Sequence, residues 1–230
     1  TPNQLSGALC ERIVMPEENC FLLPAELNLD EGVLVEPLTI AVHSLKLTGE
    51  PVPDTAAVLG AGPIGLSVLL AARAVGVRVV YVTDKIDCRV EVARKAGASW
   101  TGNPDREDII ARMRSLAPEG LDAVYECCGD QSAFSQAVEL LKPGGRLLII
   151  GIPTGDRISF DIHALRRKEL FLHNVRRQRF CVREAIDLIR NKQVDVRFMA
   201  THRFALEDSR QAFDLAAGYR DGVIRAIINP

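Results

Sequence analysis

The sequence lacks long apolar runs and a strong charge of either sign. No hydrophobic stretch in the 230 residues approaches the roughly 20 residues that a membrane-spanning helix needs. The formal net charge is −2, so a basic surface of the kind that binds nucleic acid or an anionic membrane is not expected. We therefore expect neither nucleic acid nor a membrane among the partners of this chain.

Cysteine is present but lacks the spacing of a metal site or a disulfide framework. The six cysteines are scattered, and no pair has the Cys-x-x-Cys spacing. Scattered thiols are typical of a reducing compartment, and no secretory signal is recognisable in the printed sequence. We therefore expect a cytoplasmic protein. Internal repeats and low-complexity tracts are also absent.

What is present is a regular alternation of strand and helix patterns. Short runs of apolar and β-branched residues alternate with amphipathic stretches and are joined by short connections. This rhythm predicts an α/β fold, a Rossmann-type doubly wound parallel sheet with helices on both faces. The expected strands are 55–60, 78–83, 99–101, 122–126 and 147–150, and the expected helices are 63–75, 87–96, 106–116 and 132–141.

The flanking segments have weaker patterns. Two short strands, 10–15 and 20–23, precede a helical pattern over 29–47, which we expect to break at Glu36-Pro37. An edge strand at 169–174 follows the sheet. Its apolar residues 170–172 predict pairing with a second copy of the chain, as a homodimer or homotetramer. Beyond it we expect a helix at 183–191, a strand at 199–204, a helix at 206–217 and a strand at 223–228, which should pair with the amino-terminal piece.

The first strand ends in a Gly-x-Gly-x-x-Gly motif formed by Gly60, Gly62 and Gly65. In a strand–turn–helix, the first glycine allows the tight turn and the second lets backbone amides approach a pyrophosphate. The third lets the helix lie close to the strand. Pro63 and Ile64 begin the helix, whose amino terminus favours phosphate. The motif predicts a dinucleotide-binding turn.

Asp84 ends the second strand, 24 residues after Gly60. A carboxylate at about this distance accepts hydrogen bonds from the adenosine ribose hydroxyls of a dinucleotide. A glycine turn with an unrelated surface aspartate would look the same, and a methyltransferase that binds S-adenosylmethionine shows a similar pattern. Both alternatives stay open on these residues alone.

Several segments along the chain form a recognisable series. They are Glu36-Pro37-Leu38, 58–65, Asp84, Glu126-Cys127-Cys128-Gly129, 141–145 and 216–222. In these segments the chain resembles the zinc-dependent medium-chain dehydrogenases, and most closely the sorbitol (L-iditol) and threonine dehydrogenase branch. The similarity runs over nearly the whole chain and in the same order as in the family.

This resemblance implies hydride transfer between a secondary alcohol or polyol and NAD, with a zinc ion acting on the alcohol. Members of the family begin with a GroES-like catalytic domain that holds the zinc through a Cys and a His-Glu pair. This sequence has no match to those ligands. We expect a remnant of that domain at 1–30, the NAD-binding domain at 31–174, and a segment returning to the catalytic domain at 175–230. The chain as given should bind NAD weakly and turn over no substrate.

The resemblance also assigns site residues. The pyrophosphate would be held by Gly60, Gly62, Pro63, Ile64 and Gly65. Asp84 would bind the adenosine ribose, which favours NAD, although the neighbouring Lys85 and Arg89 could accept the 2′-phosphate of NADP. Arg89 is therefore included among the cofactor-binding residues. The nicotinamide ribose would lie against Cys128, Gly129, Gly151, Ile152 and Pro153.

The remaining assignments have structural alternatives. Glu36 matches a position that faces the catalytic zinc, but could be a helix-breaking surface residue before proline. Arg177 matches a position that reaches the substrate pocket, but could lie in a solvated basic loop. His43 and the Cys127-Cys128 pair are interpreted as packing residues rather than metal ligands.

Two functional alternatives stay open. One is a zinc-free relative of the quinone reductase type, which would share the cofactor domain. The other is a binding module without catalysis, such as an NAD sensor or an S-adenosylmethionine domain.

Overall fold

A computed structural model describes residues 7–229 as a six-stranded parallel sheet with a smaller two-stranded sheet beside it. The strand order of the large sheet is β3-β2-β1-β4-β5-β6, and every neighbouring pair is parallel. This order confirms the predicted doubly wound fold. The strands are β1 (Thr55–Leu59), β2 (Val79–Thr83), β3 (Trp100–Gly102), β4 (Leu121–Glu126), β5 (Leu141–Ile149) and β6 (Phe171–Asn174).

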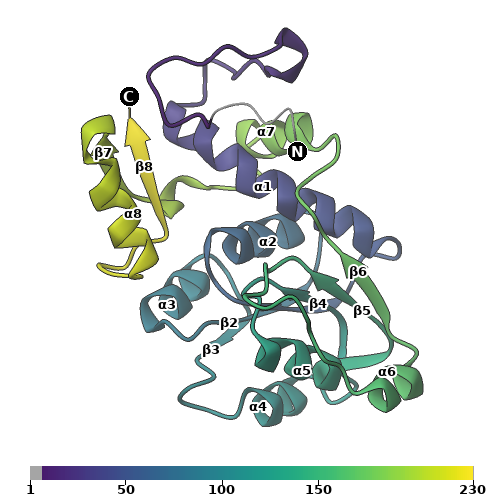
Figure 1. The fold of residues 1–230 in the computed structure, drawn as a ribbon. Helices are drawn as coiled ribbons and strands as arrows, with labels where there is room; N and C mark the ends of the chain where they lie inside the picture. Colours follow the sequence, from purple (N-terminus) through teal and green to yellow (C-terminus); the bar gives the residue numbers. More distant parts are fainter. Residues whose placement is uncertain (1–6, 230) are drawn as a thin grey trace.

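Helices cover both faces of the large sheet (Figure 1). On one face lie α1 (Leu29–Thr48), α2 (Pro63–Ala74), α3 (Asp87–Lys95) and α7 (Val182–Arg190). On the other lie α4 (Ile109–Leu116), α5 (Gln131–Leu140) and α6 (Ile162–Lys168). Strand residues alternate between these two cores, so Val58 packs under α1 and α2 while Leu59 packs under α5. None of the helices within residues 7–229 combines the length and hydropathy needed to cross a membrane.

The second sheet is formed by β7 (Ala200–Ala205) and β8 (Arg225–Asn229), with α8 (Ser209–Ala217) packed against it. The short 3-10 helices η2 (Arg197–Met199) and η3 (Leu206–Asp208) flank β7. Figure 1 shows this unit beside α2 and α3. The final strand was predicted to pair with the amino-terminal piece; this was wrong, because β8 pairs with β7 in parallel.

The amino-terminal segment contains no strand between residues 7 and 28. Its single regular element is the 3-10 turn η1 (Glu17–Asn19), so the two strands predicted there were wrong. A strand needs a neighbour to satisfy its backbone amides and carbonyls, and no other strand of the described residues lies beside this segment.

Helix α1 runs without a break through Glu36-Pro37, against the prediction. It begins with a capping box in which Asn28 and Glu31 exchange side-chain-to-backbone hydrogen bonds, both 2.9 Å long. Proline removes the amide that would bond to the carbonyl of Val33, but Val33 is exposed and that carbonyl can bond to solvent. The pyrrolidine ring of Pro37 is buried, so packing offsets the lost bond.

The sequence patterns did not predict the start of strand β5 or the presence of helix α6. Strand β5 begins at Leu141, so it passes through the segment that was expected to be a turn, and its pairing with β4 shifts register there. Helix α6 was not predicted; Asp161 caps it by accepting from the amides of His163 and Ala164. The edge position predicted for the 169–174 strand is confirmed by β6.

A buried hydrogen bond joins α1 to the sheet. Tyr125, the second-last residue of β4, has no exposed surface, and its hydroxyl lies 2.9 Å from Oγ1 of Thr48. The Thr48 hydroxyl also lies 3.0 Å from the Ser44 carbonyl, which can only accept. Since Thr48 has one proton, it donates to Ser44 and accepts from Tyr125. Burial raises the pKa of Tyr125 to about 12, which keeps this donor protonated.

This assignment predicts an asymmetry between two substitutions. Thr48→Val leaves the buried Tyr125 hydroxyl without an acceptor and should lower the free energy of unfolding by about 1–3 kcal/mol. Tyr125→Phe removes the donor while Thr48 keeps Ser44, so it should cost about 1 kcal/mol or less. Urea unfolding of both variants and of the double variant measures the difference. A double variant that is less stable than Thr48→Val alone would contradict the assignment.

Candidate functional site

The turn between β1 and α2 brings the helix directly against the strand. Gly60 has φ +104°, and its amide donates to the Thr83 carbonyl at 2.8 Å. A Cβ on Gly65 would lie 1.8 Å from the Gly60 carbonyl oxygen, so any larger residue there would displace the helix. A Cβ on Gly60 itself would lie 3.1 Å from that of Cys128, which brings the end of β4 beside the turn.

The amino terminus of α2 has no side-chain cap. Gly62 is its N-cap residue and Pro63 its first residue, and no side chain within residues 7–229 accepts from the first-turn amides. Side chains of Asn28, Asp108, Asp130 and Asp161 cap α1, α4, α5 and α6, whereas α3, α7 and α8 resemble α2 in having no such cap. Uncapped amides and the positive end of the helix dipole suit an anion. A Cβ on Gly62 would be 3.6 Å from Nη1 of Arg89, so the approach to these amides is open apart from that cation.

Asp84 follows the end of β2, and its carboxylate accepts hydrogen bonds from two loops, the one between β1 and α2 and the one between β2 and α3. Its Oδ2 accepts from the Ala61 amide at 2.7 Å, and its Oδ1 accepts from the Ile86 amide at 2.8 Å. A carboxylate has about four acceptor positions, so about two remain for a ligand hydroxyl. The carboxylate is thus held beside the turn between β1 and α2 with acceptor positions left for a ligand.

A crevice of about 340 Å³ lies at the carboxyl ends of β1, β2 and β4. Its size falls within the range of small-molecule sites. In a sheet of this topology, the ends of β1 and β4 are the switch point at which ligands bind. The predicted site residues Gly60, Asp84, Arg89 and Cys128 line this crevice, together with Asp130 and Tyr219.

Lys85 and Asp130 face each other across the crevice. Nζ of Lys85 lies 3.1 Å from Oδ2 of Asp130. Hydrogen bonds from the hydroxyl and amide of Ser132, together with Lys85, lower the pKa of Asp130 to about 2, so it stays ionised. The charge of Lys85 is therefore already balanced within the protein.

The loops that follow β4 and β5 cross at close range. Gly129 has φ +72°, and a Cβ there would lie 2.4 Å from the Ile152 carbonyl oxygen. A Cβ on Gly151 would lie 2.3 Å from the Gly129 amide nitrogen. The structure thus brings together the segments predicted for the nicotinamide ribose, with Ile152 exposed at the surface and Pro153 half-buried after it.

The Glu126 side chain contacts both loops where they cross. This side chain is fully buried at the end of β4, and Oε1 accepts from the amides of Cys128 and Gly129 at 2.7 and 2.6 Å. Within residues 7–229, its Oε2 has no hydrogen-bond partner and would lie 2.8 Å from a Cβ on Gly151. Only glycine fits at that position while the carboxylate is there.

The thiols and the histidine of this region are not poised as metal ligands. Burial, and then the Glu126 carboxylate, raise the pKa of the Cys127 thiol well above its usual value and that of Cys128 to about 12. A protonated thiol is a poor ligand and nucleophile. Burial together with Lys46 and Arg179 lowers the pKa of His43. Neutral imidazole is the form that binds metals, so for His43 the relevant observation is that the described residues contain no cluster of potential metal ligands. These features support packing roles.

Glu36 and Arg177 do not reach the crevice. Glu36 is exposed on α1. Arg177 is exposed in the loop between β6 and α7, with φ +57°. No cluster of three or more His, Cys, Asp or Glu side chains that could hold a metal ion occurs in the described part of the chain. The residues present therefore do not form a zinc site.

Three residues of the site were not predicted. Asp130 had a local signal, because an aspartate after a strand end and before a helix is a typical N-cap. Glu126 had one too, as a carboxylate at the end of a buried apolar strand. Tyr219 had no local sequence signal for a place in the crevice, because it reaches the crevice from a turn far along the chain.

Comparison with known proteins identifies the family. The model of the zinc-binding dehydrogenase family matches residues 63–191, which is more than half of the chain. The chain is 34% identical over 224 residues to L-threonine 3-dehydrogenase of Deinococcus deserti, covering 95% of this chain and 64% of that protein. It is 26% identical over 227 residues to sorbitol dehydrogenase of Bacillus subtilis, covering 98% of this chain and 64% of that protein.

A solved structure extends this similarity to three dimensions. It is a protein of Sinorhizobium meliloti 1021 named as a zinc-binding dehydrogenase and bound to NADP. The TM-score is 0.88 at 26% identity, over 97% of this chain and 66% of that one. This chain thus spans about 64% of the length of the curated relatives that it matches. It belongs to the zinc-binding dehydrogenase family and comprises the dinucleotide-binding region of that family.

Proposed function

We propose that this chain is the coenzyme-binding part of an NAD-dependent dehydrogenase that transfers hydride between a secondary alcohol or polyol and NAD. One observation carries the proposal: Gly60 and Asp84 line one crevice at the switch point of the sheet, and the turn that leads from Gly60 to the uncapped amino terminus of α2 is tied to it, because the Ala61 amide donates to Asp84. Amides there suit a diphosphate, and the carboxylate beside them suits a ribose.

The charges of the crevice favour NAD over NADP. A 2′-phosphate bound next to Asp84 would be repelled unless a cation compensated it. Lys85 is paired with Asp130, and Arg89 lies beside Gly62, on the side where the diphosphate would bind. Neither is therefore free to serve a 2′-phosphate, although the related protein of S. meliloti binds NADP.

The bound coenzyme would supply the hydride acceptor, and the chain would hold and orient it. The first-turn amides of α2 would bind the diphosphate, with Pro63 and Ile64 setting the start of that helix. The crossed loops at Gly129 and Gly151, and Ile152-Pro153 after them, would form the surface beneath the nicotinamide ribose. Both loops are rigid, because Glu126 and the glycine contacts fix them.

We propose an alcohol substrate and a zinc ion for a protein of the length of the relatives, not for this chain alone. The relatives named as sorbitol and L-threonine dehydrogenases are about one and a half times as long as this chain. Because residues 7–229 form no metal cluster, zinc chemistry is not assigned to them. Glu36 and Arg177 stay predictions as residues that would face the metal and the substrate, and we expect the isolated chain to bind NAD without turnover.

The free cysteines favour a reducing compartment, and we propose the cytoplasm as the location of the protein.

Two glycine substitutions separate coenzyme binding from folding. Gly62→Ala should change the free energy of unfolding by less than about 1 kcal/mol, because φ is −73° and its Cβ would meet only Arg89 at 3.6 Å. It should nevertheless weaken NAD binding at least tenfold, because the methyl group obstructs the diphosphate. Gly65→Ala should cost about 3 kcal/mol or more, because its Cβ clashes with Gly60.

Calorimetric titration with NAD and S-adenosylmethionine, and thermal unfolding of each variant, provide the measurements. Wild-type chain that binds S-adenosylmethionine but not NAD would refute the proposal. So would a Gly62→Ala variant that binds NAD as tightly as the wild type.

Asp84→Asn tests the ribose contact. Loss of the charged acceptor should weaken NAD binding about tenfold or more, while NADP binding falls less because the repulsion of its 2′-phosphate is removed. Asp187→Asn, an exposed aspartate on α7, is the matched control and should leave both affinities unchanged. Equal losses for NAD and NADP would show that Asp84 acts only as a loop anchor.

The edge strand supports a proposed homodimer or homotetramer. Phe171 and Leu172 on β6 are 56% and 36% exposed at the free edge of the sheet. Such an edge pairs readily with another strand. Sedimentation should show association that rises with concentration and is abolished by Leu172→Lys but not by Phe180→Lys. A wild-type chain that stays monomeric at all concentrations would contradict this.

A further inference from the structure

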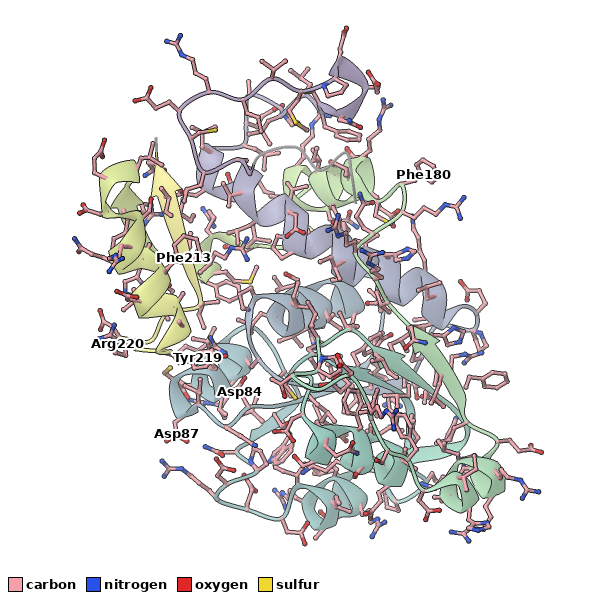
Figure 2. All side chains as sticks on the ribbon, viewed as in Figure 1. Asp84, Asp87, Phe180, Phe213, Tyr219 and Arg220 are labelled. Carbon is pink, nitrogen blue, oxygen red and sulfur yellow. The ribbon has the colours of Figure 1, made fainter. Side chains whose placement is uncertain are left out.

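Tyr219 is an aromatic residue that the C-terminal segment brings to the coenzyme crevice. It lies in the turn between α8 and β8, and it lines the crevice together with Asp84 and Arg89. In Figure 2, Tyr219 and Asp84 lie close together on the left side of the molecule. The turn is built from left-handed backbone: φ is +49° at Tyr219 and +52° at Asp221. Such conformations are uncommon outside glycine and persist where the surroundings enforce them.

The ring of Tyr219 holds the guanidinium of Arg89. Cζ of Arg89 lies 4.9 Å from the ring centroid, within the range of a cation–π contact. The Nη2 of Arg89 also donates to the Val223 carbonyl at 3.4 Å, so the same turn contacts the guanidinium twice. Nη1 then lies 3.6 Å from the position of a Cβ on Gly62, beside the uncapped amides of α2.

The charge of Arg89 is left uncompensated by this arrangement. Within residues 7–229, Arg89 forms no ion pair, whereas Lys85 in the same crevice is paired with Asp130 at 3.1 Å. An aromatic ring and a carbonyl orient a guanidinium without neutralising it. The cation therefore faces the place where a diphosphate would bind, with its charge available.

We propose that Tyr219 is a positioning residue for coenzyme binding, whose ring holds Arg89 against the phosphate-binding turn so that the guanidinium meets the diphosphate. This rests on the proposed function of the crevice. A long arginine side chain that is free on the surface must be ordered when it binds, and a side chain that is ordered beforehand avoids that cost. The C-terminal segment thereby contributes to a crevice whose other lining residues all lie between Leu59 and Gln136.

The test uses the full 230-residue chain with adenosine, ADP and NAD as ligands, titrated by calorimetry. Tyr219→Ala should raise the Kd of ADP and NAD about two- to fivefold, the change that loss of an exposed cation–π contact gives. Adenosine, which lacks phosphate, should bind as before. Tyr219→Phe keeps the ring and should match the wild type. In an Arg89→Ala background, Tyr219→Ala should cause no additional loss.

The chain offers a matched control in a second cation–π pair. Cζ of Arg179 lies 5.6 Å from the ring of Phe180, and Figure 2 shows Phe180 on the opposite side of the molecule from Tyr219. Phe180→Ala should leave all three affinities unchanged. Because both rings are exposed, neither substitution should lower the melting temperature appreciably.

Three results would overturn the inference while leaving the proposed function intact. They are unchanged ADP binding by Tyr219→Ala, an equal loss for adenosine and ADP, and a loss that persists without Arg89, which would mean that the ring touches the ligand itself. If the wild-type chain binds none of the three ligands, the proposed function fails and this inference fails with it.

Discussion

The contact between the Gly60 carbonyl and the backbone of Gly65 is the constraint from which the site follows. With only 1.8 Å between that oxygen and the place of a Gly65 Cβ, helix α2 lies directly on the turn that begins it. Its first amides therefore end at the edge of the sheet, beside the end of β4. Because β1 lies between β2 and β4, the chain leaves this point in opposite directions along the sheet, which opens the crevice there.

Four charged side chains line the crevice, and three of them, Asp84, Lys85 and Arg89, have different partners. Asp84 accepts hydrogen bonds from backbone amides, Lys85 pairs with the fourth, Asp130, and Arg89 contacts an aromatic ring and a carbonyl. Asp84 and Arg89 therefore keep their charges for a ligand, while the charge of Lys85 is balanced by Asp130. From the sequence, Lys85 and Arg89 are equivalent cations near Asp84; in the structure they are not. Under the proposed function, coenzyme preference would depend on what each cation contacts, not on how many cations are present.

The sequence predicted those parts of the fold whose causes are local. The strand–turn–helix at Gly60–Gly65, Asp84 and the alternation of strands and helices follow from spacing and periodicity. What depends on a distant partner was predicted wrongly or missed. The segment before α1 has strand-like residues but no neighbouring strand, β8 found its partner in β7, and Tyr219 reaches the crevice from a remote turn. Pro37 was misjudged because its cost depends on burial, which packing determines.

Two glycine-containing loops meet at the switch point, and only one of them offers its amides to a ligand. After β4, the amides of Cys128 and Gly129 both donate to Oε1 of Glu126, a side chain without exposed surface. After β1, no side chain caps α2. An anion that enters the crevice therefore finds its donors at the β1 turn, and the β4 loop can contribute shape but not charge. Burying a carboxylate is costly. Here the buried carboxylate occupies the amides of the β4 loop, so that they cannot bind an anion. In the proposed complex, Glu126 would thus direct the diphosphate to α2 without touching it, and the surface formed by Gly129 and Gly151 would remain for the nicotinamide ribose.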